Sequence, residues 1–145
     1  MRYLGIDLGS KTIGLAMSDE TLTIASPYKT IFFDNEDYAS TISEIKDIVS
    51  EYDIKKIIMG LPKNMNNTLG ERALITLDYK KLIEDNINIP VIMMDERLTS
   101  VISNSILIEA DMSRKKRKKK VDSIAAQIIL EDYLNKERNE RSERE

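Results

Sequence analysis

Acidic residues stand at three places in this chain where a carboxylate is costly unless it binds something. Asp7 lies within an apolar run and precedes Gly9, Asp95 and Glu96 close the run VIMMDE, and Asp122 opens the segment DSIAAQIIL. A buried carboxylate needs a counter-charge, hydrogen bonds or a metal ion. Each acid also has an ordinary explanation as the cap of a turn or helix. Only their convergence at one edge of a sheet would indicate a site.

The remaining composition limits the chemistry of such a site. The chain contains no histidine and no cysteine, which excludes Ser-His and Cys-His catalysis, disulfides and zinc sites that need Cys or His. Oxygen ligands remain, and they favour hard cations such as Mg²⁺ or Mn²⁺. Converging carboxylates would hold two such ions about 4 Å apart for phosphodiester hydrolysis. Strand side chains alternate, so one of Asp95 and Glu96 would face Asp7, and spacing alone leaves the choice open.

Positive charge is concentrated in one segment. Residues 114–120 read RKKRKKK, and without these seven the chain has 15 basic against 25 acidic residues, although the whole chain carries a net charge of only −3. A solvated loop is the ordinary explanation of such a run. Its position directly before Asp122 favours contact with the phosphates of a polyanion, because Lys and Arg displace condensed counterions from nucleic acid. The expected nucleic-acid contacts here are Arg114, Lys115, Lys116, Arg117 and Lys118.

Hydrophobic periodicity predicts an α/β fold. The order β-β-β-α-β-α-β-α-α gives a mixed five-stranded sheet with its first strand at the centre and its parallel part covered on both faces. Strands are expected at 2–8, 11–18, 23–33, 55–60 and 90–95, and helices at 36–52, 71–86, 99–111 and 121–134, with a polar loop at 62–70.

The 145 residues suggest one domain, over residues 1–135, followed by a charged tail at 136–145 that we expect to be a frayed helix end or disordered. No apolar run approaches the roughly 18 residues that a membrane span needs. Asp7 also interrupts the short stretch that could serve as a secretory signal. We therefore expect a cytoplasmic protein.

Two glycine-containing segments have the character of ligand-binding turns. Gly5, Gly9 and Gly14 in GIDLGSKTIG are expected to let backbone and ligand approach closely beside Asp7.

The second segment, GLPKNMNNTLGERA, follows a predicted parallel strand, where ligands bind in open α/β sheets. An ordinary strand-to-helix connection is the alternative. Lys63 and Arg72 are the expected phosphate ligands, and Asn64 would position the loop or the substrate.

Four segments together resemble the YqgF family, also called RuvX: GIDLGSKTIGLAMSD at 5–19, IIMGLPKNMNNTLGERA at 57–73, MDERLTS at 94–100 and VDSIAAQIILEDYL at 121–134. The family is described both as Holliday junction resolvases and as pre-16S ribosomal RNA nucleases. The resemblance runs over about residues 1–135, and it implies a ribonuclease H-like fold.

Carried over position by position, the resemblance implies that Asp7, Glu96 and Asp122 are the catalytic acids and ligands of Mg²⁺ or Mn²⁺, most simply of two ions. It thereby selects Glu96 over Asp95. Many members have arginine where this chain has Thr12, so the role of that arginine does not transfer. By this match we expect Asn64, Arg72, Arg97 and Thr99 to support the site or to bind nucleic acid. Lys11, which directly precedes the altered position, is also expected to bind nucleic acid.

The leading hypothesis is a metal-dependent endonuclease that processes the 5′ end of precursor 16S rRNA. One alternative is a Holliday junction resolvase acting on branched DNA, and another is a non-catalytic ribosome-assembly factor. An actin-like nucleotide-handling enzyme is disfavoured, because the chain has no second domain to form a nucleotide cleft. Expected partners are nucleic acid and ribosomal particles, with no membrane contact. Symmetric junction cleavage needs a dimer, whereas RNA trimming needs one site, so monomer and homodimer both remain open.

Overall fold

The computed structural model describes residues 1–9, 11–34, 37–62, 69–95 and 114–144, without the side chains of 114–122 and 141–144. The predicted order of the described elements is confirmed, and apart from α4 their ends differ by a few residues. The helix expected at 99–111 lies outside the described residues. The elements are β1 (Arg2–Leu8), β2 (Thr12–Ser18), β3 (Ala25–Phe32), α1 (Ala39–Glu51), β4 (Ile54–Leu61), α2 (Glu71–Asn86), β5 (Val91–Asp95) and α4 (Arg114–Arg144).

The five strands form one mixed sheet in the order β3-β2-β1-β4-β5. β1, β2 and β3 pair antiparallel, as short turns allow, whereas β4 and β5 each follow a longer connection and run parallel to β1. β1 is therefore the central strand, as predicted. Because β1, β4 and β5 are parallel, their carboxyl ends lie at the same edge of the sheet.

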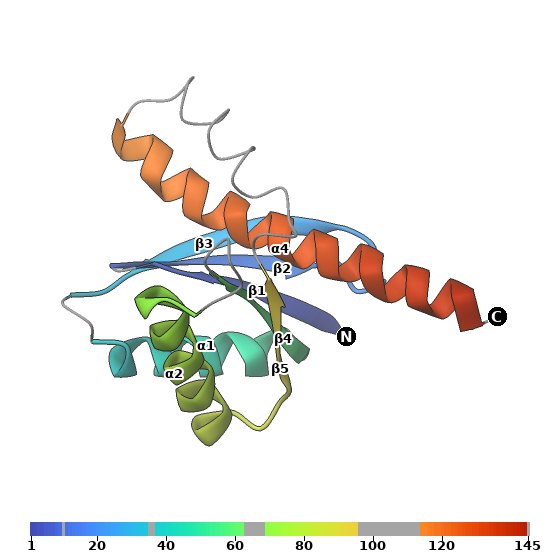
Figure 1. The fold of residues 1–145 in the computed structure, drawn as a ribbon, viewed down its shortest axis with the longest axis horizontal. Coiled ribbons are helices and arrows are strands. Elements are labelled where there is room, and N and C mark those ends of the chain that lie inside the picture. The colour runs from blue at the N-terminus through green and yellow to red at the C-terminus, as the bar shows by residue number, and fades with distance from the viewer. Residues whose placement is uncertain (10, 35–36, 63–68, 96–113, 145) are drawn as a thin grey trace.

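Helices cover both faces of the sheet, as predicted (Figure 1). Strand residues alternate between two separate hydrophobic clusters. Leu4 and Ile6 of β1 belong to the cluster under α1 and α2, with Ile45 and Ile83 from those helices. Tyr3 belongs to the second cluster, which α4 covers with small and branched side chains: Ala125, Ala126, Ile129, Leu130 and Leu134.

Gly5 allows α4 to lie unusually close to the sheet. A Cβ atom at this position would stand 2.8 Å from the carbonyl oxygen of Ala126 and 2.9 Å from the Cβ of Leu130. The expectation that Gly5 makes room for a ligand is therefore wrong, because the helix occupies that space. Gly9 does lie in a tight turn, where its amide donates to the Thr12 carbonyl at 2.7 Å.

Helix α4 is longer than predicted at both ends. It begins at Arg114, so the basic run forms its first two turns and is not a loop, and it continues through Arg144, so the tail expected to be frayed or disordered is helical. Lys and Arg are good helix formers, so a run of these residues can extend a helix and need not form a loop. α4 is long enough to cross a membrane, but it is strongly charged. Within the described ranges, no helix is both long and apolar enough to do so.

A polar cluster anchors the carboxyl-terminal half of α4 to the sheet. Glu137 accepts hydrogen bonds from Lys56 Nζ at 3.0 Å, Tyr3 Oη at 2.9 Å and Tyr133 Oη at 3.1 Å. Lys56 also lies 5.2 Å from the centroid of the Tyr3 ring, within cation–π range. Burial alone would raise the pKa of Glu137, but the hydrogen bonds from Lys56 and Tyr3 outweigh it and lower the pKa. The cluster therefore stabilises the fold in its charged form.

We expect Glu137→Gln to lower the free energy of unfolding by about 1–2 kcal/mol at pH 7, because Lys56 loses a charged partner in a partly buried place. The lowered pKa of Glu137 means that this contribution is present above the ordinary carboxyl pKa and is lost as the pH falls through the folded-state pKa. Urea unfolding of both proteins between pH 3 and pH 7 measures the difference.

The matched control is Glu84→Gln on α2. Glu84 pairs with Lys80 at 2.6 Å within one helix, but its side chain is 44% exposed against 18% for Glu137. Exposed pairs of this kind contribute about 0.5 kcal/mol or less. A loss in the Glu137 variant no larger than that of the control would contradict the anchoring role.

Candidate active site

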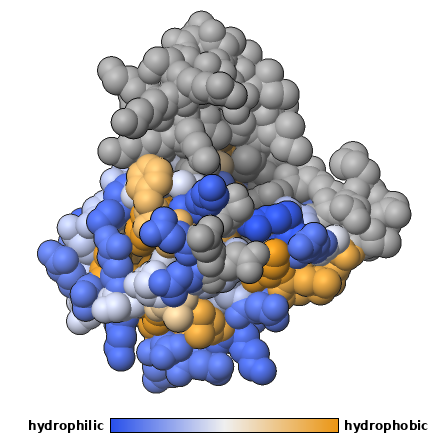
Figure 2. Space-filling view, turned by 90° about the vertical axis from the view of Figure 1, so that its left-hand side faces the viewer, coloured by the Kyte–Doolittle hydropathy of each residue, from blue (hydrophilic) through white to orange (hydrophobic). Residues whose placement is uncertain are grey.

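Asp7 lies at the carboxyl edge of the parallel strands, on the face that α4 covers. It shares this face with Tyr3 and Gly5, since side chains alternate along β1, and it is half-buried. Figure 2 looks onto the end of the molecule at which β1 ends, and hydrophilic residues dominate the described part of that surface. A carboxylate here is half-buried and can still be reached from solvent, as binding a cation requires.

Contacts between β1 and α4 fix which part of the helix approaches Asp7. Tyr3 meets Tyr133, with ring centroids 6.0 Å apart, and donates a hydrogen bond to Glu137, whereas Gly5 meets Ala126 and Leu130. Two residues forward along β1 thus correspond to about two helical turns backward along α4. The same step taken once more leads from Asp7 to residues 119–123. That stretch contains Asp122, whose backbone lies in α4 and whose side chain is outside the described set.

The register of β5 bears on the choice between Asp95 and Glu96. Ile6 pairs with Met59, so Gly60 follows beside Asp7, and Gly60 pairs with Met94. Met94 packs against the cluster under α4, whereas Met93 packs against the cluster on the other face. Alternation therefore assigns Asp95 to the face opposite Asp7. Glu96 itself lies outside the described residues.

The donor set of the proposed site is made of oxygen alone. Among residues whose side chains are described, no group of three acidic residues could hold a metal ion. Two of the three predicted ligands, Glu96 and Asp122, are not in that set. Asp7 is thus the one predicted ligand whose environment is described, and a half-buried carboxylate at a strand end fits a hard cation.

The predicted nucleic-acid contacts divide between described and undescribed positions. Arg72, the second residue of α2, donates from Nη2 to the Leu8 carbonyl at 3.2 Å, which places a guanidinium at the carboxyl end of β1. Lys11 is exposed in the β1–β2 turn. The backbone of the basic run is helical. The predicted contacts that lie outside the described residues are Lys63, Asn64 and Arg97, together with Thr99.

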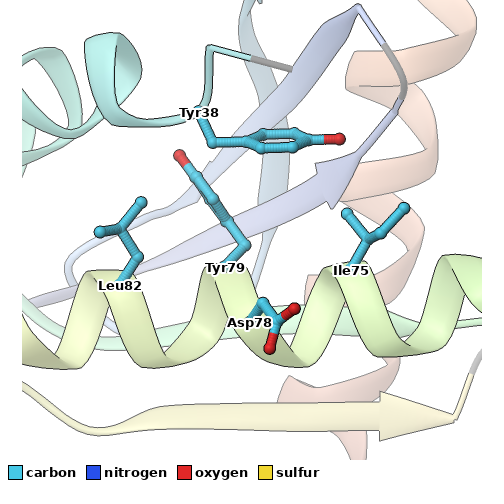
Figure 3. Close-up of a pocket in the computed structure, with 5 residues that line it drawn as sticks. All are labelled: Tyr38, Ile75, Asp78, Tyr79 and Leu82. Atoms are coloured by element: carbon cyan, nitrogen blue, oxygen red, sulfur yellow. The ribbon is translucent and has the colours of Figure 1, made fainter.

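A pocket of about 280 Å³ lies on the α1–α2 side of the molecule (Figure 3). Tyr38 lies over Tyr79, and Ile75, Leu82 and Asp78 complete its lining. Tyr79 Oη is 2.6 Å from Thr41 Oγ1, and burial raises the pKa of Tyr79 to about 12, so that this phenol stays neutral. The pocket has one carboxylate and lies on the face opposite Asp7. It does not fit the chemistry of a metal site.

A second pocket, of about 700 Å³, follows the edge of β5 beside α4. Both Met93 and Met94 line it, so it wraps around the edge of the strand and does not belong to one face. Asp95 and Asp132 border it with Asn and Lys side chains of α4. Asp7 is not among the described residues that line this pocket.

The strand order and the helices on both faces define a ribonuclease H-like protein. Two solved resolvases have the same fold: RuvC of Thermus thermophilus bound to a Holliday junction (TM-score 0.60, 13% identity, 96% of each chain) and the fowlpox virus Holliday junction resolvase (TM-score 0.54, 18% identity, 94% of this chain and 99% of that one). The model of the family described as "RuvX: Holliday junction resolvase" matches residues 1–136. The chain belongs to this family, as its motifs predicted.

Curated relatives cover nearly the same length. Proteins of Oceanobacillus iheyensis and Clostridium acetobutylicum are each 49% identical to this chain over 135 residues, which is 93% of this chain and 98% of each relative. Both bear the name "Putative pre-16S rRNA nuclease".

Two structural features that position α4 are not predicted from the sequence. The close approach at Gly5 has no local signal, because it depends on a helix more than a hundred residues away. The anchor at Glu137 does have one, since Tyr133 and Glu137 have i,i+4 spacing, although the hydrophobic periodicity of the helix ends between them.

Proposed function

We propose that this protein is a metal-dependent endonuclease that hydrolyses phosphodiester bonds in structured nucleic acid. One observation carries the proposal: the step from the α4 contacts of Tyr3 to those of Gly5, repeated once, leads from Asp7 to the stretch of α4 that contains Asp122. Family membership and the names of the relatives support the same activity.

In this proposal Asp7, Glu96 and Asp122 hold Mg²⁺ or Mn²⁺. The assignment of Asp95 to the opposite face supports Glu96 as the third ligand. When bound, the ions would activate water and stabilise the leaving oxygen of the phosphodiester. Arg72 would hold the end of β1 in place through the Leu8 carbonyl and offer positive charge at the same edge. Lys11, Lys63, Asn64, Arg97 and part of the helical basic run would bind the substrate backbone.

Precursor 16S rRNA is the substrate that the names of the relatives favour, and processing of its 5′ end would place the protein in the cytoplasm with ribosomal particles. Branched DNA is the second candidate, because the family description and the Thermus thermophilus structure both concern Holliday junctions. Contacts to a phosphate backbone serve either substrate.

A cleavage assay of the purified protein tests the proposal. Precursor 16S rRNA and a synthetic four-way DNA junction are each incubated with Mg²⁺, with Mn²⁺ or with EDTA, while the mass in solution is measured. We expect metal-dependent cleavage of the RNA. Paired cuts in the junction by a dimer would instead support the resolvase, and tight binding without cleavage in either metal would support the non-catalytic assembly factor.

A further inference from the structure

The basic run forms part of a helix whose orientation is fixed farther along the chain. One stripe of α4 contacts β1: Ala126 and Leu130 approach Gly5, and Tyr133 and Glu137 contact Tyr3. These four positions are three or four residues apart, as expected for one side of an α-helix. The stripe therefore marks the side of α4 that is turned toward the sheet.

Helical periodicity extends this stripe into the basic run. Steps of 3.6 residues backward from Ala126 lead to positions 122, 119 and 115. Asp122, Lys119 and Lys115 thus share the sheet-side stripe. Arg117 and Lys120 occupy positions on the opposite half of the helix. The run is continuous in sequence but divides into two sets once it is helical.

The sheet-side set also lies at the correct end of the molecule. The correspondence between β1 and α4 leads from Asp7 to residues 119–123, and Lys119 belongs to that stretch. Figure 1 shows the backbone of the first turns of α4 leading away from the sheet. Nucleic acid that reaches Asp7 would pass the sheet-side positions first.

We propose that Lys115 and Lys119 form the principal phosphate contacts of the basic run, and that Arg117 and Lys120 contribute little to binding. The inference rests on the proposed function, because it assumes a nucleic-acid substrate at the Asp7 edge. It adds Lys119 to the binding residues and divides the run by helix face.

Two matched double variants test this division. Lys115→Gln with Lys119→Gln and Arg117→Gln with Lys120→Gln each remove two positive charges, and Gln has nearly the helix propensity of Lys and Arg. Binding to a four-way DNA junction and to an RNA duplex is measured in EDTA at several salt concentrations. Each phosphate contact contributes about 0.9 to the slope of log K against log salt on duplex DNA. We expect the sheet-side variant to lower this slope by about 2 and the other variant by less than 1.

Equal losses in the two variants, a larger loss in the Arg117/Lys120 variant, or no salt-dependent binding by the wild type would each overturn the inference. Circular dichroism and melting temperature verify that both variants keep the helix. Binding in EDTA does not require cleavage. A wild-type protein that binds but never cuts would therefore reject the proposed function while the comparison of the two variants still decides the inference.

Discussion

Asp7→Asn should abolish metal-dependent cleavage while leaving the fold intact. The substitution keeps the shape of the side chain and removes one full negative charge from the proposed metal site. Loss of a single neutral donor at a catalytic oxyanion commonly costs 10²–10³-fold in rate. We therefore expect a decrease of about 10³-fold or more, measured as the single-turnover rate on precursor rRNA at saturating Mg²⁺.

Stability measurements separate this loss from misfolding. Removing one of several neighbouring carboxylates relieves repulsion in the metal-free protein, so the melting temperature in EDTA should stay the same or rise. Mg²⁺ should raise the melting temperature of the wild type, because it binds the folded state, and should raise that of the variant much less. Asp47→Asn, at an exposed position on α1, is the matched control and should behave as the wild type does. A variant that cuts at the wild-type rate would reject Asp7 as a metal ligand.

Most of the fold could be predicted from the sequence because its signals are local. Turn residues separate the first three predicted strands, and apolar runs mark the strands at 55–60 and 90–95. The strand ends predicted in this way are close to those of β1 to β5 in the structure. The predicted central place of β1 is confirmed by its two neighbours, β2 paired antiparallel on one side and β4 parallel on the other.

The length of α4 was harder to predict. Its hydrophobic periodicity is confined to the part that covers the sheet, where Ala126 and Leu130 are fully buried. Outside that part, helix formation depends on the propensity of Lys, Arg and Glu and on long-range contacts such as that of Glu137 with Lys56. Hydrophobic periodicity carries no information about either.

The candidate site was predicted in outline by residue type. The absence of histidine and cysteine reduced the chemistry to carboxylates, but spacing did not decide between Asp95 and Glu96. The register of β4 with β5 bears on this choice, because Met94 packs on the α4 face and alternation then assigns Asp95 to the other face. The facing of a strand residue depends on its neighbours in space, so a one-residue uncertainty in strand phase reverses it.

Gly5→Val should both destabilise the protein and lower cleavage, although Gly5 touches no substrate. Valine is favourable in a strand by intrinsic preference, so any loss comes from the contact with α4. A Cβ atom at 2.8 Å from a backbone carbonyl cannot be accommodated without moving the helix. Overpacking of this kind costs about 1–3 kcal/mol, and the extra methyl groups favour the upper end of that range. Urea unfolding measures the loss.

The effect on activity follows from the distance between strand and helix. In the proposed function α4 carries Asp122, and Gly5 lies two residues before Asp7 on the strand that α4 crosses. A displacement of α4 would separate two metal ligands, and a misplacement of about 1 Å can cost 10²-fold in rate. Ser26→Val introduces the same residue at an exposed position of β3 and should change stability by less than about 0.5 kcal/mol, with normal cleavage. If the Gly5 variant remained as stable as this control but lost cleavage, Gly5 would act on the substrate directly and not through the packing of α4.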